Sequence, residues 1–310
     1  EGVKQDYNEA FRWFKAAAEQ GDAYAQCRIG SCYYFGKGAK QDYNEAFRWY
    51  KAAAEQGYAD AQYNLGVCYY YGEGAKQDYN EAFRWYKAAA EQGYAPAQFN
   101  LGICYHYGQG VKQDYYEAFR WFKAAAEQGL AYAQCRLGYC YYNGQGVKQD
   151  YNEAFRWYKA AAEQGYAPAQ YYLGTCYYFG IGITQDYNEA FCWFKAAAEQ
   201  GDADAQYYLG ACYYFGIGIR QDYNEALRWY KAAAEQGEAG AQNSLGLCYE
   251  YGTGVIQNYK EAYYWYLISY RNGYTDAEQD VKRIENKLTY QQKQEVQKWV
   301  NDWFKTHPKE

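Results

Sequence analysis

The feature that most constrains this chain is a repeat of 36 residues. Tryptophan recurs at that spacing, at positions 13, 49, 85, 121, 157, 193, 229 and 265. Such a period is typical of stacked supersecondary units that cannot bury their apolar faces alone. We expect seven full units, each beginning with a glycine that we number +0, at 21–56, 57–92, 93–128, 129–164, 165–200, 201–236 and 237–272. Residues 1–20 are expected to form a half unit with the second helix only, and 273–310 C-terminal capping helices.

The unit 57–92 predicts two helices and no strand. Apolar residues at spacings of three and four predict a first helix from Ala59 to Tyr71. The following Gly-Glu-Gly breaks that helix, because glycine adopts positive φ at little steric cost. Asp78, with Glu81 three residues later, predicts the capping box of a second helix that runs to about Gln92.

One glycine of each unit stands inside the first predicted helix. In the unit 57–92 it is Gly66, at register +9, and all seven units carry it. Glycine costs a helix interior about 0.5–1 kcal/mol relative to alanine. We therefore expect a neighbouring helix to approach too closely there for a Cβ atom.

These residues resemble the Sel-1-like repeat family, a relative of the tetratricopeptide repeats. The resemblance spans about residues 2–272 and depends on three motifs, which are Ala61-Gln62-Tyr63-Asn64-Leu65-Gly66-x-Cys68-Tyr69, Gly72-x-Gly74 and Asp78-Tyr79-x-x-Ala82-x-x-Trp85-Tyr86. It implies an all-α fold, a right-handed superhelical α-solenoid whose first helices line a concave groove. It also implies a role as an adaptor in signalling, protein quality control or bacterial host interaction. A branch of the family has paired cysteines in each repeat, a pattern that this chain lacks.

Composition excludes several classes of protein. The net charge of −6 argues against a nucleic-acid partner, because neutralising phosphates requires clustered Lys and Arg. Neither an 18-residue apolar run nor a secretory signal is present, so we expect no membrane insertion. The sequence contains no Met and begins at Glu1-Gly2, within a predicted loop. We expect a processed or truncated precursor, so a removed leader and upstream repeats stay open.

The positions of the cysteines indicate whether the chain binds metal and in which cellular compartment it is found. Seven of the ten cysteines occupy register +11, which places them on equivalent helices too far apart for disulfides. We interpret them as small core side chains, not as metal ligands. Unpaired thiols favour the cytoplasm, whereas a removed leader would mean a periplasmic or secreted protein. The irregular Cys27, Cys135 and Cys192 are candidates for exposed, reactive thiols.

No catalytic constellation is found in the sequence. The two histidines, His106 and His307, lie far apart in the sequence, and no metalloprotease, nucleophile-elbow or phosphate-loop motif is present. We therefore predict a non-enzyme with no catalytic residue, no metal site and no cofactor. His106 stands where five of the other six units have Tyr, so it is interpreted as a variant groove residue.

The differences between units predict a partner-binding site. Variation in the first helix falls at registers +3, +6, +7, +10, +13 and +14, a stripe along one face, while the second helix hardly varies. Tyr, Asn and Arg in this stripe suit contact with a protein or peptide. The predicted site comprises Arg28, Tyr34, Tyr63, Asn64, Tyr70, Phe99, Asn100, Ile103, His106, Arg136, Tyr139, Tyr142, Tyr171, Tyr172, Tyr178, Tyr207, Tyr208 and Tyr214.

Three alternatives to this prediction stay open. Some tyrosines of the stripe are expected to pack between units instead of binding a ligand. The near-identical units and the uncapped N-terminal end also allow head-to-tail stacking into a filament or homo-oligomer. The aromatic groove allows glycan binding as a third function.

Overall fold

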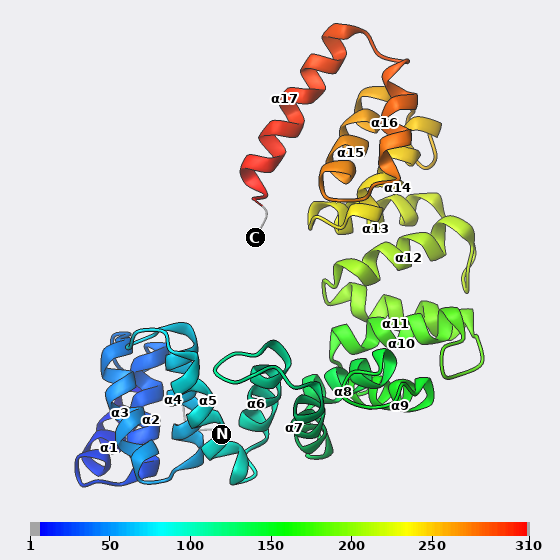
Figure 1. The fold of residues 1–310 in the computed structure, drawn as a ribbon. Helices are drawn as coiled ribbons and strands as arrows, with labels where there is room; N and C mark the ends of the chain where they lie inside the picture. Colours follow the sequence, from blue (N-terminus) through cyan, green and yellow to red (C-terminus); the bar gives the residue numbers. More distant parts are fainter. Residues whose placement is uncertain (1–6, 309–310) are drawn as a thin grey trace, which may run out of the picture. The chain divides into compact units, whose positions relative to one another are not determined.

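The computed structural model describes residues 7–308, in which every regular element is an α-helix (Figure 1). The chain forms two compact units, residues 1–157 and 158–310, whose boundary falls within α9 (Tyr151–Ala162). In each unit, successive helices stack side by side as pairs. The all-α solenoid of 36-residue repeats is thus confirmed.

The helices of the first unit are α1 (Tyr7–Glu19), α2 (Ala23–Phe35), α3 (Tyr43–Glu55), α4 (Ala59–Tyr71), α5 (Tyr79–Glu91), α6 (Ala95–Tyr107), α7 (Tyr115–Glu127) and α8 (Ala131–Asn143). Those of the second are α10 (Ala167–Phe179), α11 (Tyr187–Glu199), α12 (Ala203–Phe215), α13 (Tyr223–Glu235), α14 (Ala239–Tyr251), α15 (Tyr259–Arg271), α16 (Ala277–Glu285) and α17 (Tyr290–Thr306). Even numbers from α2 to α14 are first helices of a repeat.

Caps at both ends fix the bounds of these helices. Asp78 begins α5 by accepting hydrogen bonds from the backbone N–H groups of Asn80 and Glu81. The Glu81 carboxylate forms an ion pair with Arg84 at 3.1 Å. Gly72 ends α4 in the left-handed conformation, at φ 75°, and its N–H bonds to the Cys68 carbonyl. Helix α4 therefore has the bounds that its sequence predicts.

The core is shared between neighbouring repeats. One cluster joins alanines and Tyr86 of α5 to Leu101 and Cys104 of α6, with Trp121 of α7 packed against it. The predicted close approach at Gly66 is confirmed, because a Cβ there would lie 2.7 Å from the Tyr86 ring. Small residues on the first helix thus admit a buried aromatic ring from the second.

A buried glutamine at register +5 links three helices in each repeat. In α4, Gln62 donates from Nε2 to the Ala54 carbonyl at the end of α3, at 3.3 Å. Its Oε1 accepts from Nε2 of Gln92, which follows α5, at 2.7 Å. The same Gln–Gln bond recurs at Gln56–Gln26, Gln128–Gln98, Gln200–Gln170 and Gln236–Gln206. These bonds satisfy backbone carbonyls where one repeat meets the next.

The last helices cover the end of the second unit. Thr289 begins α17 with a complete capping box, in which the side chains of Thr289 and Gln292 each accept a hydrogen bond from the backbone N–H of the other. Val296 and Val300 of α17 and Ile284 of α16 are fully buried in one cluster with residues of α15. No helix between residues 7 and 308 is long and apolar enough to cross a membrane.

Candidate partner-binding surface

The most exposed aromatic side chains of the first helices lie at register +14, the last residue of each helix. They are between 54% and 65% exposed, and they are Phe35, Tyr71, Tyr107, Phe179, Phe215 and Tyr251. Asn143 occupies the register in α8. Register +14 belongs to the variable stripe, but the predicted site omits these six residues. Their aromatic character in six of seven units was the signal that could have found them.

The residues of the predicted site lie on the first helices, as expected, but few of them are open to solvent. Arg28 is exposed and His106 is buried, whereas the others are partly buried. Most contact a neighbouring helix, so packing explains part of the stripe. Three kinds of contact, at registers +13, +7 and +6, account for it.

At register +13 the tyrosines connect adjacent repeats. The Tyr70 ring packs edge-on against Tyr79 of α5, with centroids 5.2 Å apart, and its hydroxyl donates to Oε1 of Gln109 at 3.0 Å. The Tyr34 hydroxyl bonds in the same way to Glu73 in the next repeat. Burial and this carboxylate raise the pKa of Tyr34. Tyr142, Tyr178 and Tyr214 pack on the counterparts of Tyr79 at 5.3–5.4 Å. These tyrosines therefore have a structural role.

His106 breaks this series. It stands at register +13 in α6, and the residue corresponding to the hydrogen-bond acceptors of Tyr34 and Tyr70 is Gln145. Both His106 Nδ1 and Gln145 Oε1 are buried, and neither finds a hydrogen-bond partner among residues 7–308. The imidazole ring packs against Tyr115 and Phe122, and burial, with the nearby charge of Arg136, lowers its pKa. Histidine is too short to replace the tyrosine hydroxyl.

At register +7 the side chain lies against the buried aromatic residue of the preceding repeat. Where that residue is Tyr86 or Tyr230, Asn100 or Ser244 lies within hydrogen-bonding reach of the hydroxyl. Arginine lies over phenylalanine rings at two positions, Arg28 over Phe14 and Arg136 over Phe122, at 5.8 and 5.9 Å. Side chains at this variable register therefore contribute to the packing between repeats.

Residues at register +6 pack on the buried aromatic of their own repeat. Tyr63 lies 5.9 Å from Tyr86 between ring centroids, and Phe99 lies 5.5 Å from Phe122. Tyr171 and Tyr207 make the same contact at 6.3 and 6.0 Å. Asn64 at register +7 contacts Cys27 at +6 of the preceding repeat, with its Nδ2 3.7 Å from Sγ. The +6 and +7 side chains together form the floor of the first-helix face.

A cavity of about 190 Å³ opens in this floor between α4, α5 and α6. Its lining comprises Tyr70, Tyr71, Tyr86, Phe99, Asn100 and Ile103. Four of these belong to the predicted site, and Tyr71 belongs to the exposed +14 row. The structure therefore brings Tyr70, Phe99, Asn100 and Ile103 together around one opening.

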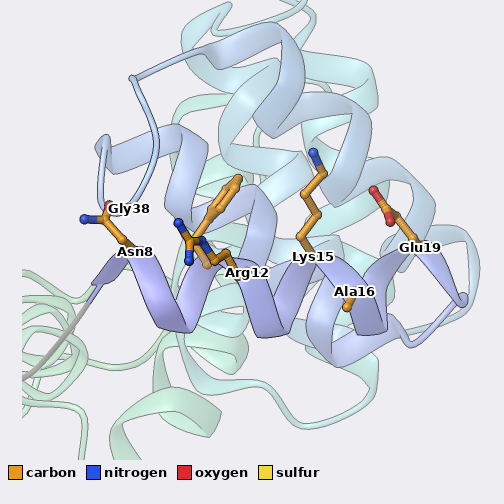
Figure 2. A pocket seen from close by; sticks show the side chains of 7 residues that line it. Asn8, Arg12, Lys15, Ala16, Glu19 and Gly38 are labelled. Atoms are coloured by element: carbon orange, nitrogen blue, oxygen red, sulfur yellow. The ribbon is translucent and has the colours of Figure 1, made fainter.

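A second, wider pocket of about 600 Å³ lies along α1 (Figure 2). Asn8 lies beside Gly38 at one end of it and Glu19 at the other, with Arg12 and Lys15 between them (Figure 2). It belongs to a second helix, and no residue of the predicted site lines it. Its mixed charges select no particular ligand.

Most of the cysteines are core side chains. Cys68 and its counterparts at +11 are free thiols, buried except for the half-buried Cys32, and burial raises the pKa of Cys68 to about 12. The expectation that Cys27 and Cys135 are exposed is wrong, since they are 4% and 7% exposed, and Cys192 alone of the three irregular cysteines is exposed. The described part of the chain contains no His, Cys, Asp and Glu cluster suited to a metal ion.

Comparison with known proteins agrees with this geometry. The family model described as Sel1 repeat matches residues 1–22, 23–58, 59–94, 95–130, 131–166, 167–202, 203–238 and 239–274. A Sel1 repeat protein from Oxalobacter formigenes, known from a crystal structure, is 35% identical in sequence to this chain. The match has a TM-score of 0.72 and covers 79% of this chain and 96% of that one.

Another solved structure is that of a protective antigen present in uropathogenic Escherichia coli strains, described as displaying an SLR fold. It is 30% identical over 98% of this chain and 81% of its own, with a TM-score of 0.48. No curated protein matches the chain at a significant level. The repeats that build this surface are matched along nearly the whole sequence, and the chain belongs to the Sel1 repeat family.

Proposed function

We propose that the chain is a non-catalytic interaction scaffold that binds a protein or peptide along its first helices. The observation that carries this proposal is the row of exposed aromatic side chains at register +14. Burying one such side chain yields about 1.5–3 kcal/mol, so water-exposed rings repeated along a face favour a partner that covers them. Tyrosine is also enriched among the residues that dominate interface energies.

The partly buried residues of the predicted site form the floor beneath this row. Tyr63, Phe99 and Tyr171 place ring surface there, while Asn64 and Asn100 supply amide groups. Side-chain amides can hydrogen-bond both the N–H and the C=O of a peptide backbone. The proposed partner therefore contacts exposed rings with its side chains and the floor with its backbone or an inserted side chain.

A displayed library of random peptides, selected on the whole chain, tests this proposal. The triple variant Phe35→Ser, Tyr71→Ser, Tyr107→Ser is expected to lose most binding to the selected peptides, because it removes three exposed rings that are not themselves members of the buried clusters. Tyr116→Ser is the matched control, since Tyr116 is 63% exposed but lies on the second helix α7. Equal losses from both variants would contradict the proposal.

A further inference from the structure

The cavity between α4, α5 and α6 has counterparts in the same chain that show what fits it. At register +7 the cavity has Asn100, whereas the corresponding residue of a later repeat is Tyr208. The Tyr208 ring stacks on the buried Phe194 with centroids 5.0 Å apart and planes 20° apart. Tyr172 stacks on Tyr158 in the same way, at 5.0 Å and 18°.

Three neighbours of the Tyr208 ring have their equivalents in the lining of the cavity. Besides Phe194, that ring contacts Tyr178 at 5.9 Å and Phe179 at 6.4 Å. Three periods earlier in the chain, the residues equivalent to Tyr178, Phe179 and Phe194 are Tyr70, Tyr71 and Tyr86, and all three line the cavity. Asparagine at position 100 thus leaves open a space that a tyrosine side chain fills elsewhere in the protein.

The size and polarity of the cavity suit an aromatic ring. Its volume is about 190 Å³, and an engineered apolar cavity of about 150 Å³ in another protein is large enough for benzene. Ring faces line most of it, and no charged side chain is among the lining residues. The Asn100 amide lies near the Tyr63 and Tyr86 hydroxyls.

Resting on the proposed function, we infer that this cavity binds the ring of a Phe or Tyr side chain of the peptide partner. The ring stacks on Tyr86, as Tyr208 does on Phe194, and Tyr71 covers its outer edge. An arginine is the competing occupant, because Arg28 and Arg136 occupy the same register. They lie over phenylalanine rings, however, whereas the ring beneath this cavity is a tyrosine, as it is beneath Tyr172.

Binding of small probes to the whole chain tests the inference. Fluorine NMR with 4-fluorophenol, and competition by N-acetyl-tyrosinamide, are expected to show saturable binding. Asn100→Tyr fills the cavity with the side chain found at 172 and 208, so it is expected to fold normally and to lose that binding. Tyr208→Asn is expected to add a second site. Tyr116→Ser is the control and is expected to leave binding unchanged.

Absence of saturable binding to the wild type overturns the inference, as does binding that survives in Asn100→Tyr. Preferential competition by N-acetyl-argininamide also overturns it, in favour of arginine. The selected peptides separate the inference from the proposed function. If they bind Asn100→Tyr as tightly as the wild type, the aromatic anchor fails while the scaffold function stands. If no peptide is selected at all, the scaffold function fails, whatever the phenol does.

Discussion

At the scale of the residue, the side chain at register +7 packs over the buried aromatic of the preceding repeat. A buried hydroxyl requires a hydrogen-bonding partner, whereas a phenylalanine ring has no such requirement. Asn100 meets that requirement for Tyr86, and Arg136 lies over Phe122, which makes no such demand. Differences between near-identical repeats therefore have two causes, internal compensation and contact with a partner. Only the second bears on function.

His106 offers a test of internal compensation. The change His106→Tyr is expected to raise the free energy of unfolding by about 1–3 kcal/mol, because it supplies a hydroxyl to the unpaired Gln145 Oε1. Urea denaturation of the two proteins measures the difference. Gln145→Leu is made in both the wild type and His106→Tyr, and it should lower the free energy of unfolding only when residue 106 is Tyr. A destabilised His106→Tyr would show that the two side chains are not correctly placed.

The same histidine predicts a pH dependence. Burial and Arg136 lower the pKa of His106 below its ordinary value of 6.5, so the folded state favours the neutral ring. The unfolded chain then binds the proton more readily, and stability is lost as pH falls from 6.5 through the folded-state pKa. Denaturation midpoints from about pH 7.5 to about pH 5.5 should fall more for the wild type than for His106→Tyr. Parallel curves would exclude this contribution.

Within the stripe, the sequence could predict the face but not the exposure of each side chain. Tyr70 and Tyr71 are adjacent, aromatic and both in the variable stripe. Tyr70 turns toward the next repeat and bonds to Gln109, while Tyr71 is 65% exposed. That choice depends on the packing between helices, which a period does not reveal. The predicted site consequently included the +13 tyrosines and omitted the +14 row.

At the scale of the element, caps and close contacts decide where helices begin, end and approach. The end of α4 could be predicted from the sequence, because Gly72 readily adopts the positive φ that ends the helix. The glutamine bonds could not be predicted. In the sequence Gln62 is indistinguishable from an ordinary polar helix residue, and its partner Gln92 lies 30 residues away. Local chemistry is visible in a sequence, whereas contacts between helices require the packed structure.

Gly66 allows the close helix contact to be tested. The change Gly66→Ala is expected to destabilise the protein by about 1–3 kcal/mol, although alanine is the better helix former, because its Cβ would overlap the Tyr86 ring. Thermal denaturation measures the effect. Gly57→Ala is the comparison, since a Cβ there meets no atom within 4 Å and only the positive φ opposes it. A larger loss at Gly57 would contradict the role of ring contact.

The glutamine bonds are tested by removing one or both partners. Replacing Gln62 by Leu is expected to cost about 1–3 kcal/mol, because it removes two hydrogen bonds worth about 0.5–1.5 kcal/mol each, one to the Ala54 carbonyl and one from Gln92. Gln92→Leu removes the second bond from the other side. If the two residues act through their shared bond, the double variant should lose less than the sum of the single losses. Additive losses in chemical denaturation would argue against that bond.

At the scale of the whole molecule, stability comes from contacts between neighbours in sequence order. The 36-residue period predicts this arrangement, because each repeat must cover the apolar face of the one before it. The last face is covered by α16 and α17, whose residues Ile284, Val296 and Val300 are fully buried. These three residues lie in the divergent segment 273–310, so the repeat pattern could not predict their partners.

The terminal helices therefore provide a test of local stability. Val300→Asp places an unpaired charge in the cluster with α15 and is expected to destabilise this end by at least about 3 kcal/mol. Hydrogen exchange should show lost protection in α16 and α17, with little change in α4 to α6. Gln294→Asp, an exposed change in the same helix, is the control. Uniform loss of protection along the chain would contradict nearest-neighbour stability.

The hydrogen bonds between repeats have a consequence for how such a gene can change. Gln–Gln bonds always join residues 30 apart, and the Tyr34–Glu73 and Tyr70–Gln109 bonds join residues 39 apart. Unequal recombination that deletes residues 93–128 would preserve both offsets, and it would give Tyr70 the orphaned Gln145 as its new acceptor. Whole repeats can thus be lost or duplicated without breaking the bonding scheme, and each such event lengthens or shortens the row of exposed rings by one residue, except where the repeat is the one that carries Asn143.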